Sequence, residues 1–254
     1  MYSTTPTISQ IVTFHSEGVL AHFTLSSLTR VREYASRQKI PIEFVLTLDR
    51  ADELTKHIVK NHPFVTKGDQ IIEVNHGDLA LSRNSGVEAA RGEYIGTMDG
   101  DDYYSSNWPV AALELAKTFE DPVVIHPELC VAFGASYSVT RITDMIKDPF
   151  SFAVCLSHHP WISCSFGIRE IYLAHPYHRT DLKETGFGYE DWHWNVEVLA
   201  HGIVHASAPN TALFYRRKAE SMVTTMVSAG AIIRPSAFYD RVEAWAEINT
   251  DARS

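Results

Sequence analysis

Three aspartates, Asp99, Asp101 and Asp102, occupy four consecutive positions directly after a short apolar segment, Tyr94–Met98. The segment is nearly uncharged, which predicts a buried strand with the acids at the point where it leaves the sheet. Carboxylates held this close repel one another unless a cation or hydrogen-bond donors compensate them. A hard divalent ion such as Mg²⁺ or Mn²⁺ would do so, bound by one or two carboxylates plus substrate phosphate oxygens. The alternative is an acidic surface turn, because Asp and Gly are common turn residues.

A second acidic pair, Glu190 and Asp191, follows the residues GFGY at the start of a predicted helix. A carboxylate in such a position can act as a general base and accept the proton of an attacking hydroxyl. An acid at a helix N-terminus is also a common cap, and the helix dipole would weaken it as a base. This segment alone leaves both roles open.

Composition excludes several classes of protein. The 254 residues, of which 45% are hydrophobic and 21% charged, can bury a substantial core. The net charge of −9 argues against a nucleic-acid partner, which would favour a basic surface. The odd cysteine count, with no close metal-type pair, predicts reduced thiols and a cytoplasmic location. We expect no signal peptide and no transmembrane segment, while peripheral membrane association stays open.

Thirteen histidines raise the question of zinc. His175 with His178, and His201 with His205, have ligand-like spacing, but Gly202 interrupts the helix of the second pair. No cysteine pair completes a tetrahedral set, so we expect no zinc site. A Gly-x-Gly-x-x-Gly loop after the first strand is also missing from the sequence, which disfavours a dinucleotide-dependent dehydrogenase.

The elements that must position these residues alternate between strand and helix in the first half of the chain. In order they are the strand Ile8–Phe14, the helix Glu17–Arg37, the strand Ile42–Leu48, the helix Asp52–Asn61, the strand Gln70–Val74, a helix capped by Asp78 and closed by Gly92, and the strand Tyr94–Met98. This alternation implies right-handed crossovers and a mainly parallel sheet, with ligands at the carboxyl ends of the strands. His15, Glu17, Asp49 and Asp99–Asp102 should therefore lie along one rim.

The second half is less regular. Short apolar runs mix with His, Pro and Cys between Asp121 and Pro176, which predicts added strands and loops over one end of the sheet. The other predicted elements are the helices Asn107–Lys117, Glu190–Ala200 and Pro235–Ile248 and the strands Ile203–His205 and Ala212–Tyr215.

Four segments together resemble the GT-A glycosyltransferases, and family two among them: FHSEG, LTLDRAD, LALSRNSGVEAARGEYIGTMDGDD and GFGYEDWHWNVEVLAHG. The resemblance implies a single α/β domain over residues 1–254. Its GT-A fold is Rossmann-like, with a mainly parallel central sheet flanked by helices and an irregular acceptor-side region. Residues 1–105 would bind the nucleotide-sugar, and residues 106–254 would provide the acceptor site, the catalytic base and a C-terminal helix.

The resemblance also implies an activity: inverting transfer of a sugar from a nucleotide-sugar, by default a UDP-sugar, to a carbohydrate or other hydroxyl-bearing acceptor. Asp99, Gly100 and Asp101 would form the Asp-x-Asp motif that contacts the ribose and a Mn²⁺ or Mg²⁺ ion, with Asp102 as an alternate ligand or support. The metal would act as a Lewis acid on the leaving diphosphate. Asp191 becomes the general base, with Glu190 beside it.

Other donor contacts follow from the resemblance in the same way; they are His15, Glu17, Asp49, Arg83, Arg216 and Arg217. Asp49 would accept a hydrogen bond from the base, or it is a turn aspartate. Arg83 would contact the donor, or it is an exposed helical arginine. Arg216 and Arg217 would bind the diphosphate from a closing segment, or they belong to a solvated basic turn.

The acceptor site is expected near His158 and Trp161, because an aromatic face suits the apolar side of a sugar ring. A tryptophan of the core is the alternative. Two other functions stay open. One is a metal-dependent phosphoryl-transfer enzyme or nucleotide-sugar hydrolase, although phosphatases need a nucleophilic Asp after an early strand. The other is a catalytically silent nucleotide-sugar-binding module, against which the joint presence of Asp99, Asp101 and Asp191 argues.

Overall fold

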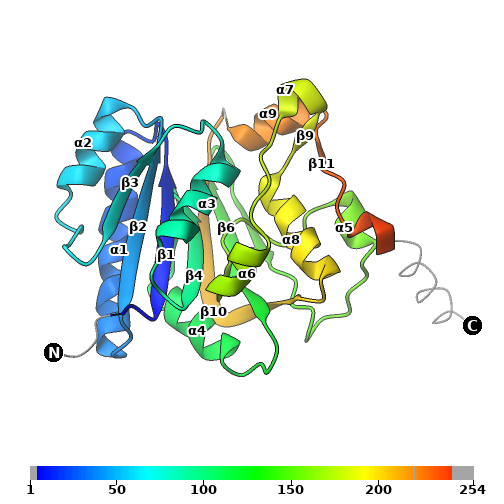
Figure 1. Ribbon diagram of the computed structural model, residues 1–254, viewed down its shortest axis with the longest axis horizontal. Helices are drawn as coiled ribbons and strands as arrows, with labels where there is room; N and C mark the ends of the chain where they lie inside the picture. Colours follow the sequence, from blue (N-terminus) through cyan, green and yellow to red (C-terminus); the bar gives the residue numbers. More distant parts are fainter. Residues whose placement is uncertain (1–4, 220, 242–254) are drawn as a thin grey trace, which may run out of the picture.

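The chain builds one large mixed sheet with helices on both faces (Figure 1). The computed structural model describes residues 5–219 and 221–241, and the main sheet within them has nine strands. The first seven elements are β1 (Ile8–Phe14), α1 (Val19–Arg37), β2 (Ile42–Asp49), α2 (Glu53–Asn61), β3 (Gln70–Val74), α3 (Leu79–Ala89) and β4 (Tyr94–Asp99). The later elements are β5 (Tyr103–Tyr104), α4 (Trp108–Ala116), β6 (Val123–Gly134), β7 (Ser138–Arg141), α5 (Val154–Ser157), β8 (Phe166–Ile168), α6 (Arg169–Ala174), α7 (Leu182–Thr185), β9 (Phe187–Gly188), α8 (Glu190–Ala200), β10 (Val204–Arg217), α9 (Met222–Ser228), β11 (Ile232–Ile233) and the 3₁₀ turn Tyr239–Arg241.

The first half of the chain forms the parallel part of the sheet, in the order β3-β2-β1-β4. β8 then pairs antiparallel with β4 and β6, while β6 and β10 form a second parallel pair. β5 closes the far edge antiparallel to β10. The sheet is therefore parallel where strands and helices alternate, and mixed beyond that point.

The inner strands alternate between two apolar layers, as the two-residue period of a strand requires. Val12 and Leu46 pack into the layer under α1 and α4, whereas Ile11 and Val45 pack into the layer under α3, α6 and α8. All four side chains are fully buried. Because helices cover both faces, these strands are apolar on both sides, which is why the sequence shows nearly continuous apolar runs.

The expected rim is confirmed by the strand register. Thr13 at the end of β1 lies opposite Asp99 in β4, and Asp49 at the end of β2 lies opposite Val74 in β3. Glu17 follows β1 in the turn to the next helix. The carboxyl ends of all four parallel strands thus meet at one edge of the sheet.

Aspartates begin α2 and α3, as predicted. The carboxylates of Asp52 and Asp78 each accept a backbone N–H of the first turn, at 2.7 and 3.0 Å, which satisfies donors that the helix leaves unpaired. Gly92 was expected to close α3, and this expectation is wrong. The helix ends at Ala89, and a side chain at Gly92 would come within 2.6 Å of the backbone nitrogen of Ser9. Gly92 therefore permits close approach to β1.

Other element boundaries differ from the predictions. α1 begins at Val19, so Glu17 lies in a turn and not in the helix. The two strands expected near residues 203 and 215 are a single strand, β10, whose register shifts between Ala208 and Ala212. The region expected to add strands and loops over one end of the sheet instead contributes β6, a 12-residue strand inside the main sheet.

The expected closing helix Pro235–Ile248 lies partly outside the described residues. Up to Arg241 this segment contains turns and the short 3₁₀ turn only. None of the helices within residues 5–219 and 221–241 is long and apolar enough to cross a bilayer. Cys130, Cys155 and Cys164 are all free thiols, as expected.

A glycine on α3 sets the distance between this helix and the sheet. A Cβ atom at Gly86 would lie 2.5 Å from Ile11 Cγ2 and 3.1 Å from Thr47 Oγ1. Such contacts require the helix or the strands to shift. Gly86 is accordingly needed for α3 to rest directly on β1 and β2, which in turn places Arg83 near the rim.

We predict that Gly86→Ala lowers the free energy of unfolding by up to about 2 kcal/mol, because overpacking costs about 1–3 kcal/mol and better helix propensity returns about 1 kcal/mol. Urea unfolding followed by circular dichroism measures the change. Gly68→Ala is the matched control, since its added methyl group would meet only an ordinary contact at 3.6 Å. Equal stability of both variants would contradict the packing argument.

Candidate active site

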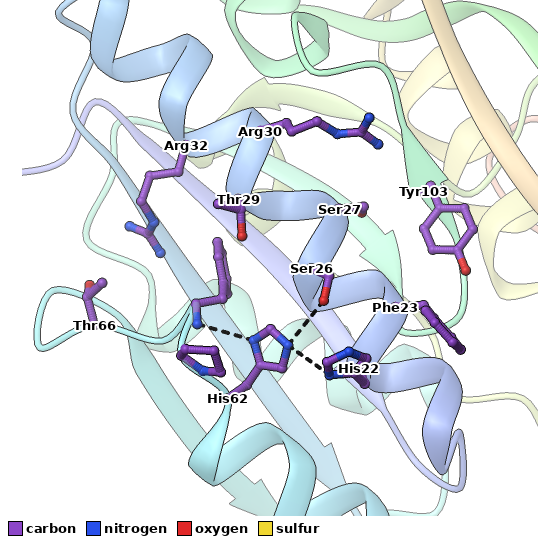
Figure 2. Close-up of a pocket in the computed structure, with 12 residues that line it drawn as sticks. His22, Phe23, Ser26, Ser27, Thr29, Arg30, Arg32, His62, Thr66 and Tyr103 are labelled. Atoms are coloured by element: carbon purple, nitrogen blue, oxygen red, sulfur yellow. Dashed lines mark hydrogen bonds between the residues drawn. The ribbon is translucent and has the colours of Figure 1, made fainter.

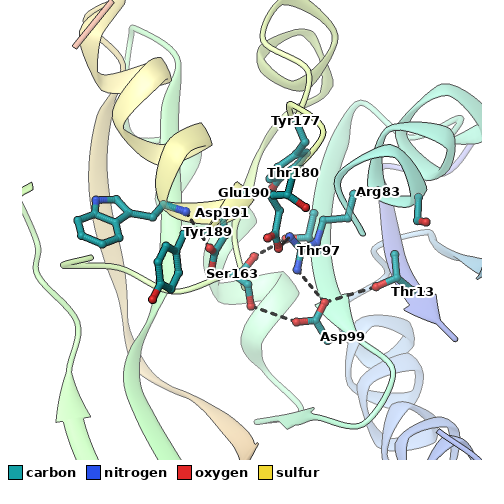
Figure 3. A network of polar contacts seen from close by, with 12 residues as sticks. Thr13, Arg83, Thr97, Asp99, Ser163, Tyr177, Thr180, Tyr189, Glu190 and Asp191 are labelled. Atoms are coloured by element: carbon teal, nitrogen blue, oxygen red, sulfur yellow. Dashed lines mark hydrogen bonds and ion pairs between the residues drawn. The ribbon is translucent and has the colours of Figure 1, made fainter. Parts of the chain in front are cut away.

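Asp99 stands at the end of β4 and is held by three side chains (Figure 3). Its Oδ1 accepts hydrogen bonds from Arg83 Nη2 at 2.8 Å and from Thr13 Oγ1 at 3.4 Å, and its Oδ2 accepts one from Ser163 Oγ at 3.3 Å. The carboxylate is partly exposed. These donors come from α3, β1 and the loop before β8, so the position of Asp99 is fixed from several directions.

Arg83 connects the two halves of the chain. Its side chain is only 1% exposed, and its Nη1 donates to Glu190 Oε1 at 2.8 Å while Nη2 binds Asp99. Burial works against the guanidinium charge, but Asp99 and Glu190 outweigh it and raise the pKa of Arg83. The alternative of an exposed helical arginine is thereby excluded.

Glu190 is buried at the start of α8, next to the candidate base. Burial, followed by the negative charge of Asp191, raises the pKa of Glu190 to about 7, against the opposing charge of Arg83. The 2.8 Å hydrogen bond from Arg83 Nη1 is what holds Glu190 in place, and Asp191 is the member of the pair with a partly exposed carboxylate.

The two carboxylate oxygens of Asp191 have different neighbours, one at the start of α8 and one beside His159. Oδ1 accepts the backbone N–H of Trp192 at 2.8 Å, and Oδ2 lies 3.8 Å from His159 Nδ1. The N-cap position of α8 belongs to Tyr189, which has a left-handed backbone and makes no side-chain cap. Asp191 thus binds a backbone N–H of the first turn without being the N-cap residue, and its second oxygen remains available to accept a proton.

Asp101 and Asp102 face different partners. Asp101 forms an ion pair with Lys218, whose Nζ lies 2.5 Å from its Oδ2, and Asp102 Oδ1 accepts the backbone N–H of Arg216 at 2.7 Å. Burial, then repulsion from Asp101 and Asp99, raises the pKa of Asp102 well above its usual range. Burial, together with the negative charge of nearby Asp101, raises the pKa of Glu17 to about 7.

Gly100 separates the two aspartates because the turn leaves no room for a side chain. A Cβ atom there would lie 2.4 Å from the ring of Phe14 and 2.6 Å from the carbonyl oxygen of Thr13. The backbone of the turn therefore rests on the end of β1. This close approach brings Asp101 over the rim.

The three aspartates do not converge on one point. No group of three His, Cys, Asp or Glu side chains that could hold a metal ion occurs in the part of the chain that the structure describes. A divalent ion in a phosphate site needs only one or two carboxylates, since the substrate supplies the other oxygens. Asp101 fits this role, because its partner is the half-exposed Lys218 and because neighbouring carboxylates leave an excess of negative charge around it.

Asp49 has a different role from the one expected. Its carboxylate accepts four hydrogen bonds, from the backbone N–H groups of residues 76, 77 and 78 and from Ser82 Oγ, at 2.7–3.0 Å. Burial alone would raise the pKa of Asp49, but the four hydrogen bonds outweigh this effect and lower the pKa. With its acceptor positions filled, Asp49 holds the turn before α3 and is not free to bind a nucleobase. The alternative, a turn aspartate before the next helix, differs as well, because the turn that Asp49 holds precedes α3 and not α2.

The two arginines expected at the diphosphate are directed elsewhere. Arg216 lies over the rings of Tyr103 and Phe133, which stack on each other, and it donates to the Tyr103 hydroxyl and to the carbonyl oxygen of Asp101. Arg217 donates to Ser136 Oγ at 3.0 Å. Both are held by protein partners, so the expectation that they bind the donor is not supported by their contacts.

Trp161 is a core residue, contrary to the expectation that it lines an acceptor site. It is 3% exposed, stacks on His205 with ring centroids 3.9 Å apart, and donates from Nε1 to the Thr143 carbonyl oxygen. Its faces are therefore covered. His158 is exposed and its ring contacts Ser157 Oγ.

His15 and Glu17 lie together in the turn after β1. The His15 backbone N–H donates to Glu17 Oε2 at 2.5 Å, and its ring Nδ1 contacts the Asp49 carbonyl oxygen at 2.7 Å. Both residues are at least partly exposed at the rim. They remain candidates for contact with a nucleoside.

Sequence reasoning did not identify three residues of this cluster: Thr13, Ser163 and Asn195. Lys218 and His159 were noted only as parts of the segments that contain Arg216 and Trp161. Ser163 carries no local signal, since it reaches Asp99 from a loop 64 residues further along the chain.

A cavity of about 810 Å³ lies beside α1 (Figure 2). Its lining residues are His22, Phe23, Ser26, Ser27, Thr29, Arg30, Arg32, His62, Pro63, Phe64, Thr66 and Tyr103. Inside it, His62 Nε2 contacts both His22 and Ser26. The lining contains none of the candidate carboxylates, so this cavity is not the centre of the chemistry.

Comparison with known proteins identifies relatives of this chain. The family model described as Glycosyl transferase family 2 matches residues 9–143. The chain is 41% identical over 69 residues to "Uncharacterized glycosyltransferase EpsJ" of Bacillus subtilis (strain 168), a stretch that covers 26% of this chain and 19% of that protein.

Solved structures share the fold at low sequence identity. TarS 1–349 of S. aureus in complex with UDP-GlcNAc superposes with a TM-score of 0.63 at 16% identity, covering 92% of this chain and 63% of TarS 1–349. The mannosyltransferase PcManGT of Pyrobaculum calidifontis, in complex with GDP-Man and Mn²⁺, has a TM-score of 0.57 at 14% identity, covering 87% and 59%. The predicted GT-A fold is confirmed, and the chain spans less than two thirds of each of these relatives.

We predict that Arg83→Met lowers the free energy of unfolding by about 3–5 kcal/mol, because it leaves two carboxylates without their buried partner. Urea unfolding measures the loss. Arg141→Met is the matched control: its ion pair with Asp148 is exposed and should contribute little. A loss no larger than that of the control would show that Arg83 does not hold the two halves together.

Proposed function

The chain belongs to glycosyl transferase family 2, and from this premise we propose that it transfers a sugar from a nucleotide-diphosphate sugar to an acceptor hydroxyl with inversion at the anomeric carbon. Asp191 is the proposed general base. Donor and acceptor would meet between the rim of the parallel strands and the first turn of α8. We expect the reaction to be cytoplasmic and of the hexosyltransferase type.

One observation carries this proposal: a single guanidinium binds both Asp99 and Glu190 at 2.8 Å. Asp99 belongs to the Asp-x-Asp motif, and Glu190 directly precedes Asp191. Arg83 therefore keeps the candidate base on the same side of the molecule as the candidate donor site. An inverting transfer needs this arrangement, because the base must reach the acceptor while the leaving group occupies the opposite side of the sugar.

The proposed step forms one bond and breaks one. The acceptor oxygen bonds to the anomeric carbon as its proton passes to Asp191, and the bond from that carbon to the diphosphate oxygen breaks with its electron pair on the diphosphate. A carboxylate serves as the base because it carries the negative charge that the proton neutralises. Glu190 takes no proton in this step, since it is occupied by Arg83.

The carboxylates at the rim suit a divalent cation, Mn²⁺ or Mg²⁺. Asp101 would hold it, with Asp99 or Asp102 as a support, and the cation would supply Lewis-acid stabilisation of the leaving diphosphate. Lys218 is the side chain placed to add a further positive charge. Burial acts against its ammonium, but Asp101, Glu17 and Asp102 outweigh this and raise its pKa, so Lys218 is charged near neutral pH.

The donor nucleotide is proposed to be uridine diphosphate, contacted by His15 and Glu17 in the turn after β1. The relatives differ in this respect: the TarS complex contains UDP-GlcNAc and the PcManGT complex contains GDP-Man. The acceptor is proposed to be a carbohydrate or another hydroxyl-bearing molecule. Cleavage of the nucleotide-sugar at the same rate with and without an acceptor would instead favour the hydrolase alternative.

Asp191→Asn tests the base. The variant should bind the nucleotide-sugar as the wild type does, while transfer falls by about 10²–10⁴-fold, because the amide cannot accept the proton. Calorimetry measures binding, and release of the nucleotide diphosphate measures transfer. Asp121→Asn, at an exposed site, is the control and should behave as the wild type. Near-normal turnover of Asp191→Asn would remove it as the base.

Asp101→Asn tests the metal. Wild-type protein should bind UDP more tightly with Mn²⁺ than after chelation, whereas the variant should show the same weak affinity in both conditions, because the carboxylate that holds the cation is gone. Thermal shift and calorimetry measure both effects. Asp148→Asn should keep the metal dependence. An unchanged Mn²⁺ effect in Asp101→Asn would contradict the assignment.

A further inference from the structure

A histidine from a distant loop lies against the helix that bears the proposed base. His159 follows α5, and its side chain is 17% exposed. It contacts Asp191 and Asn195, which are four residues apart on α8 and therefore lie on the same face of the helix. One imidazole ring thus spans a full turn of α8.

The contacts determine which ring nitrogen carries the proton. Asn195 Nδ2 donates to His159 Nε2 at 2.7 Å, so Nε2 offers a lone pair and the proton of the neutral ring is on Nδ1. Burial lowers the pKa of His159 more than Asp191 raises it, which keeps the ring neutral near pH 7. The reverse orientation of the Asn195 amide would place the Nδ1 lone pair opposite the carboxylate, which is unfavourable. Nδ1–H therefore faces Asp191 Oδ2.

Packing holds the ring in this orientation. His159 stacks on Trp192, with centroids 6.0 Å apart and planes 6° from parallel. Trp192 is itself fixed, because its Nε1 donates to the Cys155 carbonyl oxygen of α5 at 3.0 Å. Asn195 is 1% exposed. The imidazole is thus oriented by groups that take no part in the proposed transfer.

We propose that His159 is a positioning residue for Asp191, an inference that rests on the proposed function. Its Nδ1–H holds the Asp191 carboxylate in the orientation that receives the acceptor proton, and Asn195 fixes the tautomer. The 3.8 Å separation of Nδ1 and Oδ2 exceeds a hydrogen bond, and such contacts commonly shorten when substrates bind. His159 gives and takes no proton: the hydroxyl proton passes to Asp191, and the electron pair of the broken bond passes to the diphosphate.

Two substitutions of His159 distinguish the role of Nδ1 from that of Nε2. In His159→Asn the amide nitrogen can occupy the place of Nδ1, so a donor to Asp191 is kept and the contact with Asn195 is lost. In His159→Gln the longer amide reaches the place of Nε2, so the contact with Asn195 is kept and the donor to Asp191 is lost. His201→Gln is the matched control, because His201 Nδ1 lies 3.7 Å from Glu197 at the other end of the same helix.

The test measures steady-state transfer by the full chain with a nucleotide-sugar that the wild type uses. His159→Gln should lower kcat by about 10–100-fold without changing the donor KM, because a misplaced reacting group costs about that much. His159→Asn should stay within about threefold of the wild type, and His201→Gln should match it. In an Asp191→Asn background, His159→Gln should cause no further loss, since the two residues act as a unit.

Melting temperatures of all variants accompany the kinetics. Equal loss of kcat in His159→Asn and His159→Gln, or a further loss in the Asp191→Asn background, would overturn the positioning role and indicate a purely structural one. Unchanged kcat in His159→Gln would overturn it as well. Failure of the wild type to transfer sugar from any nucleotide-sugar would refute the proposed function and this inference together. The contradicting results named above for the His159 variants would refute the inference alone.

Discussion

A buried guanidinium is the constraint on which the rest of the site depends. Arg83 lies between Asp99 of β4 and Glu190 of α8, and the latter is 107 residues further along the chain. Buried ion pairs contribute little net stability, because desolvation offsets their attraction, yet the loss of one partner leaves an uncompensated charge. The main effect of these ion pairs is therefore geometric: Arg83 is compensated only when the end of β4 and the first turn of α8 both lie against it. Gly86, which lets α3 rest on the sheet, places Arg83 at the depth where both carboxylates are within reach.

Negative charge gathers at the rim beyond that constraint. Asp101, Asp102 and Glu17 interact with one ammonium, that of Lys218, and the pKa values of Asp102 and Glu17 are raised in consequence of burial and mutual repulsion. A free diphosphate would be repelled by such a surface, whereas a diphosphate that brings a divalent cation would be attracted. The same excess charge explains why Lys218 pairs with Asp101.

Local patterns were sufficient to predict most of the parallel half of the fold. Apolar runs gave the positions of β1 to β4, and Asp52 and Asp78 marked the starts of two helices, because strand periodicity and helix capping depend on near neighbours in sequence. From these elements the common rim follows by topology alone. The prediction failed where distant residues decide the outcome. Gly92 looked like a helix-ending glycine, but its actual role is close approach to Ser9 in β1.

Side-chain direction is the part of the site that sequence could not supply. Trp161 and His159 are two positions apart, and the sequence left the tryptophan open as an acceptor contact or a core residue. In the structure Trp161 turns into the core against His205, while His159 turns toward Asp191. What distinguishes them is the partner on α8: Asn195, 36 residues from His159, donates a hydrogen bond from Nδ2 to the ring nitrogen Nε2 of His159. Spacing along the chain carries no record of such a contact. The identity of a group that orients a base is therefore decided by the packing of two segments, and it becomes visible only when both are seen together.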